Sequence, residues 1–400
     1  MLKEAYIIDG ARSPFAVYGG SLKDVHPTDL GAFVLKEAIR KAGVAPENVT
    51  GTIIGNALAY DTQACMVHRH VARKAGLPIE TSGMHVNTLC GTGYQCVATA
   101  AYQIQLGLHE IMGVVGTECM DRLPYYIDSK KLRPWGAGAG NIEIIDQLFN
   151  PKINVFMDET TGLTMPLTAE NVIEKYGITR EECDEYTLRS HLLAQKATES
   201  GRFAQEIVPI EVKDRKETRM FTTDENIRKD ISMEKLAKLK PVFRADGKVT
   251  AGNASGINSG AAAIILASGE AVKKYGLKPL AKFVGNKLIG CEPTLMGLGP
   301  VPAMNGLLEE KGLKLSDMDL IEINEAFAGQ VLGCVKEMGI DMDKFNVNGS
   351  GIAIGHPIAA TGVRIVLSLA YEMKNRDSKY GMASICIGGG QGSAILFERP

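Results

Sequence analysis

Three short segments of the chain each place a reactive side chain beside glycine, an arrangement that suits covalent catalysis by a thiol. Cys90 lies in VNTLCGTGYQ, His356 in GSGIAIGHPIAATG and Cys386 in SICIGGGQGSA. Cys90 follows a short apolar stretch and opens a helical pattern over residues 90–107. At a helix start the free N–H groups and the helix dipole favour an anion. We therefore expect the thiolate of Cys90 to be stabilised and to act as a nucleophile.

Composition excludes several classes of protein. The 400 residues are 45% hydrophobic and 22% charged, with a net charge of −2 and no long basic run, which disfavours nucleic acid as a partner. A chain of this length is expected to form two or three domains. No apolar run is long enough to span a bilayer, and the N-terminus enters a strand pattern without the apolar core of a signal peptide. We therefore expect a cytoplasmic protein without a membrane partner.

The eight cysteines are spread along the chain without CxxC pairs, and the seven histidines include no HExxH pattern. We expect neither a metal site nor a disulfide framework. Most of the cysteines have the surroundings of small core residues. The same alternative applies to Cys90 and Cys386 when their motifs are set aside.

The chain contains a weak internal repeat. Residues 26–57 and 299–328 each read as a helix, a short loop and an apolar strand that ends at a polar turn. The segments around Cys90 and His356 each read as a glycine turn, a helix and a strand. This alternation predicts α/β layering. Two related halves would place Cys90 and His356 at the starts of equivalent helices whose N-termini approach each other.

The middle of the chain, residues 123–251, has a different character, with one helical and one strongly charged section. We expect it to be an inserted loop domain. The N-terminal half would then comprise residues 1–122 plus 252–272, and the C-terminal half residues 273–400. The basic side chains of the insert would suit a phosphorylated ligand, although a solvated surface explains them equally well.

Five segments, in order, resemble motifs of the thiolase family. They are VNTLCGTGYQ, TAGNASGINSGAAA, NEAFA, GHP followed by TG, and CIGGGQG, and the resemblance covers nearly the whole chain. It implies an α/β protein with a duplicated thiolase fold, five-layered α-β-α-β-α, and an inserted loop domain that binds coenzyme A. It also implies a homodimer or dimer of dimers, with coenzyme A and acyl-CoA as substrates and no prosthetic group.

The implied reaction is thiolytic cleavage of a 3-oxoacyl-CoA to a shortened acyl-CoA and acetyl-CoA, or the reverse Claisen condensation. Cys90 would carry the acyl group, His356 would be its base and a donor to the thioester oxygen, and Cys386 would exchange the proton of the acetyl carbon. Asn324 would hold a water in one oxyanion hole, and the N–H groups of Cys90 and Gly388 would form the other. Asn324 could instead cap the following helix, and His356 could form only a structural turn.

Other positions match contacts of the family with coenzyme A or the acyl group. Arg228 matches a contact with the adenine–phosphate end, and Ser255 matches a contact with the pantetheine arm. Phe243 and Phe327 would line the tunnel but could also be plain core residues. The remaining tunnel and pocket positions are Val242, Ala251, Ala326, Met165 and Met296.

Some positions depart from the short-chain enzymes. Thr164 stands where acetoacetyl-CoA thiolases usually carry a histidine, and the glycine-rich segment around Trp135 is a few residues longer. These departures favour a degradative enzyme for a larger acyl group, branched or aromatic (as in benzoylsuccinyl-CoA), and leave room for a small zinc-ribbon/OB-fold partner subunit. Met165 and Met296 match the short-chain enzymes and favour a biosynthetic acetoacetyl-CoA thiolase instead.

Two rival functions fit less well. A decarboxylating enzyme of the ketoacyl synthase type would need a second histidine where this chain has Cys386. A non-catalytic subunit would have no need for the four reactive side chains that the chain retains.

Overall fold

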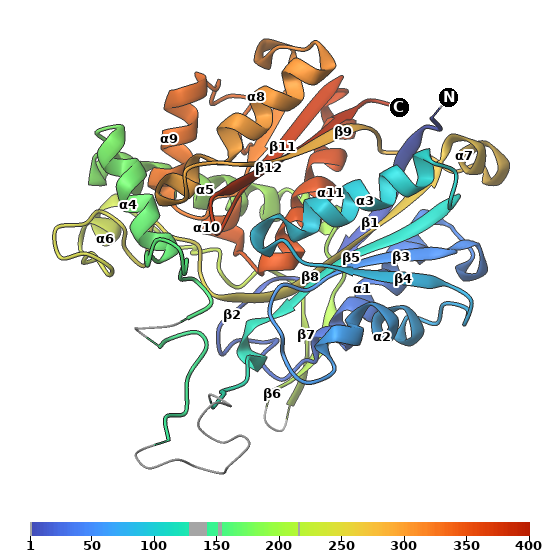
Figure 1. Cartoon of the computed structure of the whole chain (residues 1–400), viewed down its shortest axis with the longest axis horizontal. Coiled ribbons are helices and arrows are strands. Elements are labelled where there is room, and N and C mark those ends of the chain that lie inside the picture. The colour runs from blue at the N-terminus through green and yellow to red at the C-terminus, as the bar shows by residue number, and fades with distance from the viewer. Residues whose placement is uncertain (1, 128–141, 151–153, 215–216) are drawn as a thin grey trace.

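The computed structural model describes residues 2–127, 142–150, 154–214 and 217–400, which are drawn in colour in Figure 1. Trp135 and the glycine-rich turn predicted around it lie outside these residues. Within the described part of the chain, no helix has both the length and the apolar character needed to cross a membrane.

Within the described residues, ten strands form one hydrogen-bonded sheet made of two smaller sheets that meet edge to edge. In spatial order the first contains β4 (Ser82–Val86), β3 (Gly51–Gly55), β5 (Ile111–Cys119), β8 (Asn258–Ser268) and β1 (Ala5–Arg12), with the short β2 (Ala16–Val17) beside β8. The second contains β9 (Ala281–Gly290), β12 (Gln391–Glu398), β11 (Tyr380–Ile387) and β10 (Leu320–Ile323). Only two residue pairs, between β1 and β9, join the sheets.

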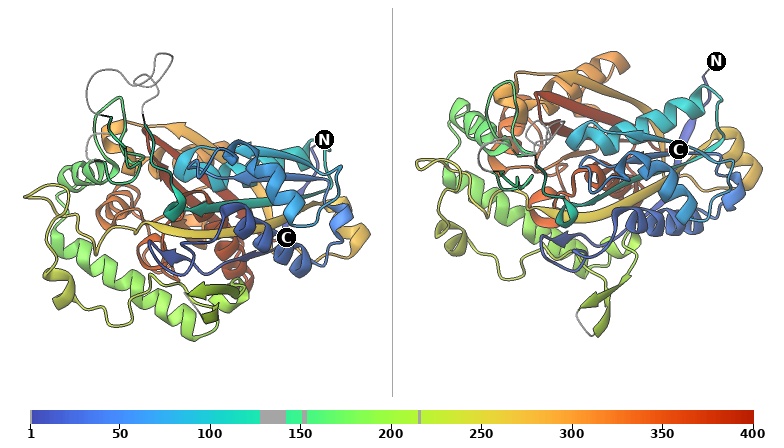
Figure 2. Two further views of the ribbon diagram at one scale, coloured as in Figure 1. Left: turned by 90° about the horizontal axis from the view of Figure 1, so that it is seen from below. Right: turned by 60° about the horizontal axis from the view of Figure 1, so that its bottom comes forward.

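Helices cover both sheets and fill the space between them (Figures 1 and 2). The outer layer on the first sheet consists of α1 (Pro27–Ala42) and α2 (Val67–Lys74), and the outer layer on the second of α8 (Pro300–Lys311) and α9 (Ala328–Met338). The central layer consists of α3 (Thr92–Gln105) and α11 (Ile358–Arg376), which pack on each other and on both sheets. The predicted five-layered α-β-α-β-α arrangement is confirmed.

The two halves repeat the same order of elements. α1 followed by β3 corresponds to α8 followed by β10, and α3 followed by β5 corresponds to α11 followed by β11. The helix, loop and strand predicted for both copies of the repeat are therefore observed. The second copy has only a reduced counterpart of β4, a single parallel bridge between Ile321 and Phe345.

The segment between β5 and β8 has helices and a hairpin of its own. They are α4 (Met165–Lys175), α5 (Arg180–Glu199), α6 (Met233–Ala237) and the hairpin of β6 (Ile210–Asp214) and β7 (Glu217–Phe221). β8 returns to the first sheet, where it pairs with β1 and β5. The remaining α-helices of the described residues are the short α7 (Gly269–Tyr275), between β8 and β9, and α10 (Gly351–Ile354), before α11. The three-part domain division proposed above remains a prediction.

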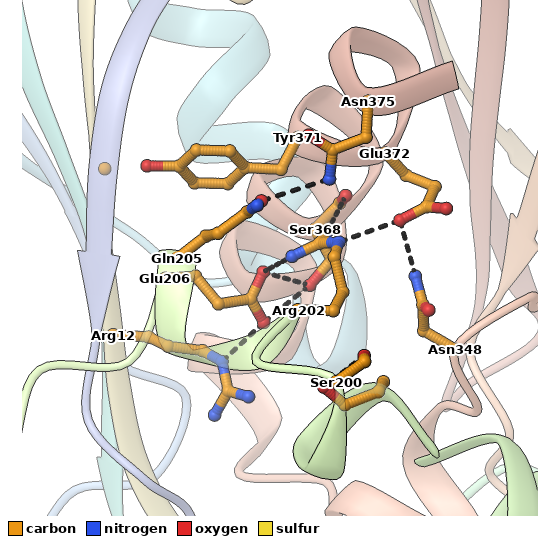
Figure 3. Close-up of polar contacts among 12 residues, drawn as sticks. Arg12, Ser200, Arg202, Gln205, Glu206, Asn348, Ser368, Tyr371, Glu372 and Asn375 are labelled. Atoms are coloured by element: carbon orange, nitrogen blue, oxygen red, sulfur yellow. Dashed lines mark hydrogen bonds and ion pairs between the residues drawn. The ribbon is translucent and has the colours of Figure 1, made fainter.

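A buried ionic network joins this middle segment to α11 (Figure 3). The Arg202 guanidinium contacts Glu372 at 2.7 Å and Glu206 at 3.3 Å, and Glu206 in turn contacts Arg12 of β1 at 2.8 Å. The Ser368 hydroxyl also donates to Glu206 at 2.9 Å. Since each buried charge has an oppositely charged partner, the network holds the body of α11 in one position.

Candidate active site

The two catalytic candidates of the central layer occupy equivalent positions. Cys90 lies two residues before α3, and His356 lies two residues before α11. The helix predicted over residues 90–107 begins later, at Thr92, and ends at Gln105. Cys90 itself lies in a 3₁₀ turn, Leu89–Gly91. Leu89 has a φ of 48°, in the left-handed region that is strained for a leucine, so the backbone bends sharply at the candidate nucleophile.

A single cavity of about 690 Å³ brings most of the predicted site residues together. The four that it shares with the predicted catalytic set are Cys90, His356, Cys386 and Gly388. The seven that it shares with the predicted coenzyme A and acyl contacts are Met165, Val242, Phe243, Ser255, Met296, Ala326 and Phe327.

The thiol of Cys90 is not ionised by its position alone. Burial raises the pKa of Cys90 to about 11, although the backbone N–H groups of Gly388 and of Cys90 itself act to lower it. The stabilised thiolate expected at the helix start is therefore not the resting state, and a base must take the proton before attack. The same two N–H groups are the predicted donors of the second oxyanion hole.

His356 has the environment of such a base. Its Nδ1 lies 2.6 Å from the Thr361 hydroxyl, which donates to the carbonyl of Pro357 at 3.2 Å. Thr361 therefore accepts from Nδ1–H, and the lone pair of Nε2 is free. Burial lowers the pKa of His356 to about 3, with a smaller effect of the Arg364 charge, so the ring is neutral at pH 7. The His356 N–H donates to Asn258 Oδ1 at 3.0 Å, which fixes the turn.

Three buried groups in or near the site lack hydrogen-bond partners within the described residues. Two of them, Nε2 of His356 and Oδ2 of Asp158, belong to residues that line the cavity. The third is the side-chain amide of Asn324, both its oxygen and its nitrogen, although Asn324 is not among the lining residues. An unsatisfied buried polar group costs about 1–3 kcal/mol, so a bound water or a polar ligand atom beside these groups would be favourable. This arrangement fits the water predicted at Asn324. The capping alternative does not fit, because α9 begins at Ala328 after Phe327, without any side-chain cap.

Cys386 has the environment of an acid. It lies near the end of β11, is 1% exposed and lines the cavity. Burial raises the pKa of Cys386 well above its ordinary range, and the nearby Cys90 thiol adds to this effect. A thiol that keeps its proton at neutral pH can give it to a carbanion and take it back.

Two predicted coenzyme A contacts do not line the cavity. Arg228 and Ala251 are both exposed, and the Arg228 guanidinium lies 3.5 Å from the Ala251 carbonyl oxygen. They remain predictions. Thr164, which replaces the usual histidine, does lie in the cavity wall.

The site also includes an apolar wall beside Cys90, whose residues were not predicted from the sequence. A compact cluster packs against Cys90, with side chains of Ala57, Leu58, Met120, Leu148, Ile358 and Ala359. Of these, Met120, Leu148 and Ile358 line the cavity, together with Val155 and Phe156. No local pattern marks these residues, because they come from four separate segments. Thr361 could have been found, since it belongs to the TG of the histidine motif.

The comparisons with known proteins agree with this geometry. Residues 5–270 match the family described as "Thiolase, N-terminal domain", and residues 277–399 match "Thiolase, C-terminal domain". The chain belongs to the thiolase family. It is an acyltransferase of that family.

Relatives match the chain over its whole length. The human mitochondrial 3-ketoacyl-CoA thiolase is 42% identical, over 100% of this chain and 99% of the relative. The acetyl-CoA acetyltransferase of Syntrophomonas wolfei is also 42% identical, over 100% of both chains. A crystal structure of the human mitochondrial 3-ketoacyl-CoA thiolase in complex with CoA superposes on this thiolase with a TM-score of 0.94 at 41% identity. It covers 100% of this chain and 98% of the other.

Proposed function

We propose that this thiolase cleaves a 3-oxoacyl-CoA with coenzyme A through an acyl group carried on Cys90. The observation that supports this most directly is one cavity lined by Cys90, His356 and Cys386, with the Nε2 lone pair of His356 free. Coenzyme A is proposed as a substrate, since the human relative has been solved with it, and no prosthetic group is required.

The proposed first half-reaction cleaves the C2–C3 bond of the substrate. His356 takes the Cys90 proton, and the sulfur attacks the 3-oxo carbon while the N–H groups of Cys90 and Gly388 bind the oxyanion. The tetrahedral intermediate collapses, C2 leaves as the enolate of acetyl-CoA, and Cys386 gives it a proton. Protonated His356 and a water held by Asn324 would bind the enolate oxygen.

The second half-reaction releases the shortened acyl group. Cys386, left as a thiolate, first recovers a proton from protonated His356. Neutral His356 then takes the proton of the coenzyme A thiol, and the sulfur of coenzyme A attacks the acyl-Cys90 thioester. The tetrahedral intermediate collapses to acyl-CoA, and Cys90 leaves and regains its proton from His356. The same steps in reverse form a C–C bond, so the chemistry alone does not choose a direction.

We propose a degradative role with an acyl group larger than acetoacetyl. The apolar wall of Met120, Leu148, Phe156 and Ile358 supports this, because it surrounds Cys90 with surface suited to an alkyl or aryl chain. A branched or aromatic substrate used with a zinc-ribbon/OB-fold partner is one alternative. A biosynthetic acetoacetyl-CoA thiolase is the other, and the buried Met296 in the cavity wall favours it.

We also propose a cytoplasmic homodimer, alone or as half of a dimer of dimers. β4 lies at the edge of its sheet, and its residues Ser82–Met84 are exposed, which suits pairing with another copy. Sedimentation of the purified chain would test this. A monomer at micromolar concentration would contradict it.

Mapping of the acyl-enzyme tests the central proposal. Incubation with acetyl-CoA or acetoacetyl-CoA should add one acyl group, and peptide mapping should place it on Cys90. Cys90→Ser should lose most of the activity, because a hydroxyl is a far poorer nucleophile at neutral pH. Cys65→Ser, at an exposed cysteine outside the cavity, is the matched control and should react normally. Acylation of another cysteine with Cys90 unmodified would refute the assignment.

A further inference from the structure

The carboxylate of Glu118 lies at the junction of the two halves, close to the proposed nucleophile and base. It is the penultimate residue of β5 and is 1% exposed. Within the described residues, no Lys, Arg or His forms an ion pair with it. A buried carboxylate without a cation is costly unless hydrogen bonds satisfy it, so its partners show what it holds.

All four partners of Glu118 are N–H donors. One oxygen accepts from Asn56 Nδ2 at 2.8 Å and from the Leu58 N–H at 3.2 Å. The other accepts from the Ala57 N–H at 3.0 Å and from the Ala359 N–H at 3.2 Å. Four donors saturate an ionised carboxylate.

These donors come from both halves of the molecule. Asn56, Ala57 and Leu58 directly follow β3 of the first half. Ala359 is the second residue of α11 in the second half, three residues after His356. A Cβ placed on Gly116 would lie 2.1 Å from the Ala359 carbonyl oxygen, so β5 lies directly against the start of α11. Glu118 therefore bridges the first half to the helix start that carries the proposed base.

The same residues form part of the wall beside Cys90. Ala57, Leu58 and Ala359 belong to the apolar cluster that packs against the Cys90 side chain. Their backbone is held by Glu118, and their side chains face the cluster. A shift of this carboxylate would therefore move the apolar wall and the His356 turn together.

Packing alone does not account for an acid at this position. Burial raises the pKa of Glu118 to about 7, against the lowering effect of its four hydrogen bonds. Ionisation is thus opposed by the surroundings, and an apolar residue would avoid that opposition. A glutamine would keep one acceptor oxygen but would turn an NH₂ donor towards two N–H donors.

We propose that Glu118 is a positioning residue. It holds the start of α11, which carries His356, and the apolar wall beside Cys90 in fixed positions relative to Cys90. It touches neither substrate nor the reacting atoms, and it acts by fixing the backbone on both sides of them. The proposal rests on the assignment of Cys90 and His356 made above.

The test compares Glu118→Gln with Glu170→Gln. Glu170 is a matched control, because it is also 1% exposed and also accepts backbone N–H groups, those of Lys248 and Val249, at 2.8 Å. A misplacement of about 1 Å can lower a rate about 100-fold, so we expect E118Q to lower kcat about 10–100-fold while KM changes less than about threefold. E170Q should keep kcat within about twofold of the wild-type value, even if its melting temperature falls as far as that of E118Q.

Single-turnover acylation separates the outcomes. Acylation of Cys90 by acetyl-CoA should slow in E118Q by the same factor as kcat. If E118Q is not folded, Asn56→Ala, which removes one donor and keeps the carboxylate, should lower kcat about 3–10-fold by the same mechanism. Folded E118Q, or N56A in its place, with normal kcat and normal acylation would overturn the proposal. A parallel fall of kcat in E170Q would reduce the effect to general loss of stability and would also overturn it. Failure of the wild-type chain to acylate Cys90 would instead refute the proposed function.

Discussion

Gly93 of α3 and Gly362 of α11 lie back to back where the two central helices cross. A Cβ placed on Gly93 would come within 2.7 Å of the Gly362 Cα, and one placed on Gly362 would come within 2.9 Å of the Gly93 Cα. Only glycine at both positions allows this approach. Since Cys90 and His356 each lie two residues before one of these helices, the crossing sets how close the proposed nucleophile and base can lie.

Gly362→Ala should therefore separate the helices and impair both stability and catalysis. Overpacking of a close contact costs about 1–3 kcal/mol, and the shifted helix start should lower kcat/KM at least about tenfold. Gly306→Ala in α8 is the control, because its Cβ would meet nothing nearer than 3.5 Å. It should be neutral or more stable by up to about 1 kcal/mol. Thermal unfolding and steady-state kinetics measure both. Equal behaviour of the two variants would refute the role of the crossing.

Thr361→Val should reduce activity without preventing folding. The change is nearly isosteric, but it removes the oxygen that accepts from His356 Nδ1–H at 2.6 Å and leaves that donor buried. The ring can then rotate or change tautomer, so we expect kcat to fall about 10–100-fold. Thr361→Ser retains the hydroxyl and should keep most of the activity. If valine and serine give the same kcat, the hydrogen bond does not set the tautomer.

Cys386→Ala should separate acyl transfer from proton exchange. The variant should still acylate Cys90 from acetyl-CoA, because Cys386 takes no part in that step. It should lose exchange of the α-protons of bound acetyl-CoA with deuterated water, by about 10²–10⁴-fold. Mass spectrometry of recovered acetyl-CoA measures the exchange. Exchange at the wild-type rate would transfer the acid and base role to another residue, such as His356.

Acidification should destabilise the wild-type protein more steeply than His356→Asn. Burial lowers the pKa of His356 to about 3, below the ordinary value of 6.5. Between these values the unfolded chain binds a proton that the folded protein does not bind. The contribution of the neutral His356 ring to the free energy of unfolding is therefore complete above pH 6.5 and is lost as the pH falls towards 3. The difference in slope should reach about 1.4 kcal/mol per pH unit at most. Denaturant unfolding at several pH values measures it, and parallel slopes would show that the buried ring is not neutral.

The rate of thiolytic cleavage should rise in a graded way with acyl size. The apolar wall around Cys90 and Thr164 in place of a histidine both favour larger groups. A hydrophobic pocket discriminates by about 1–3 kcal/mol per methylene, so kcat/KM should climb by steps across acetoacetyl, straight-chain, branched and aryl 3-oxoacyl-CoA thioesters. The highest kcat/KM with acetoacetyl-CoA would instead identify a short-chain enzyme.

Local patterns in the sequence predicted the elements and supplied the candidate reactive residues. The helix, loop and strand order of both repeats follows from apolar periodicity, which depends on neighbouring residues and is present before the chain folds. Cys90, His356, Cys386 and Gly388, which line one cavity, became candidates for the same reason, because each lies in a short glycine-containing motif.

Only the tertiary structure decided how these groups behave. The protonated resting state of Cys90 and the neutral ring of His356 result from burial, which depends on everything packed around them. The roles proposed for Thr361 and Glu118 depend on which donors and acceptors meet, and only the folded structure shows this. The apolar wall beside Cys90 likewise combines residues from distant segments of the chain. Sequence by itself determined which chemistry this thiolase can perform. The crossing of α3 and α11 at Gly93 and Gly362 brings that chemistry to one place, because contacts between residues about 270 positions apart exist only after folding.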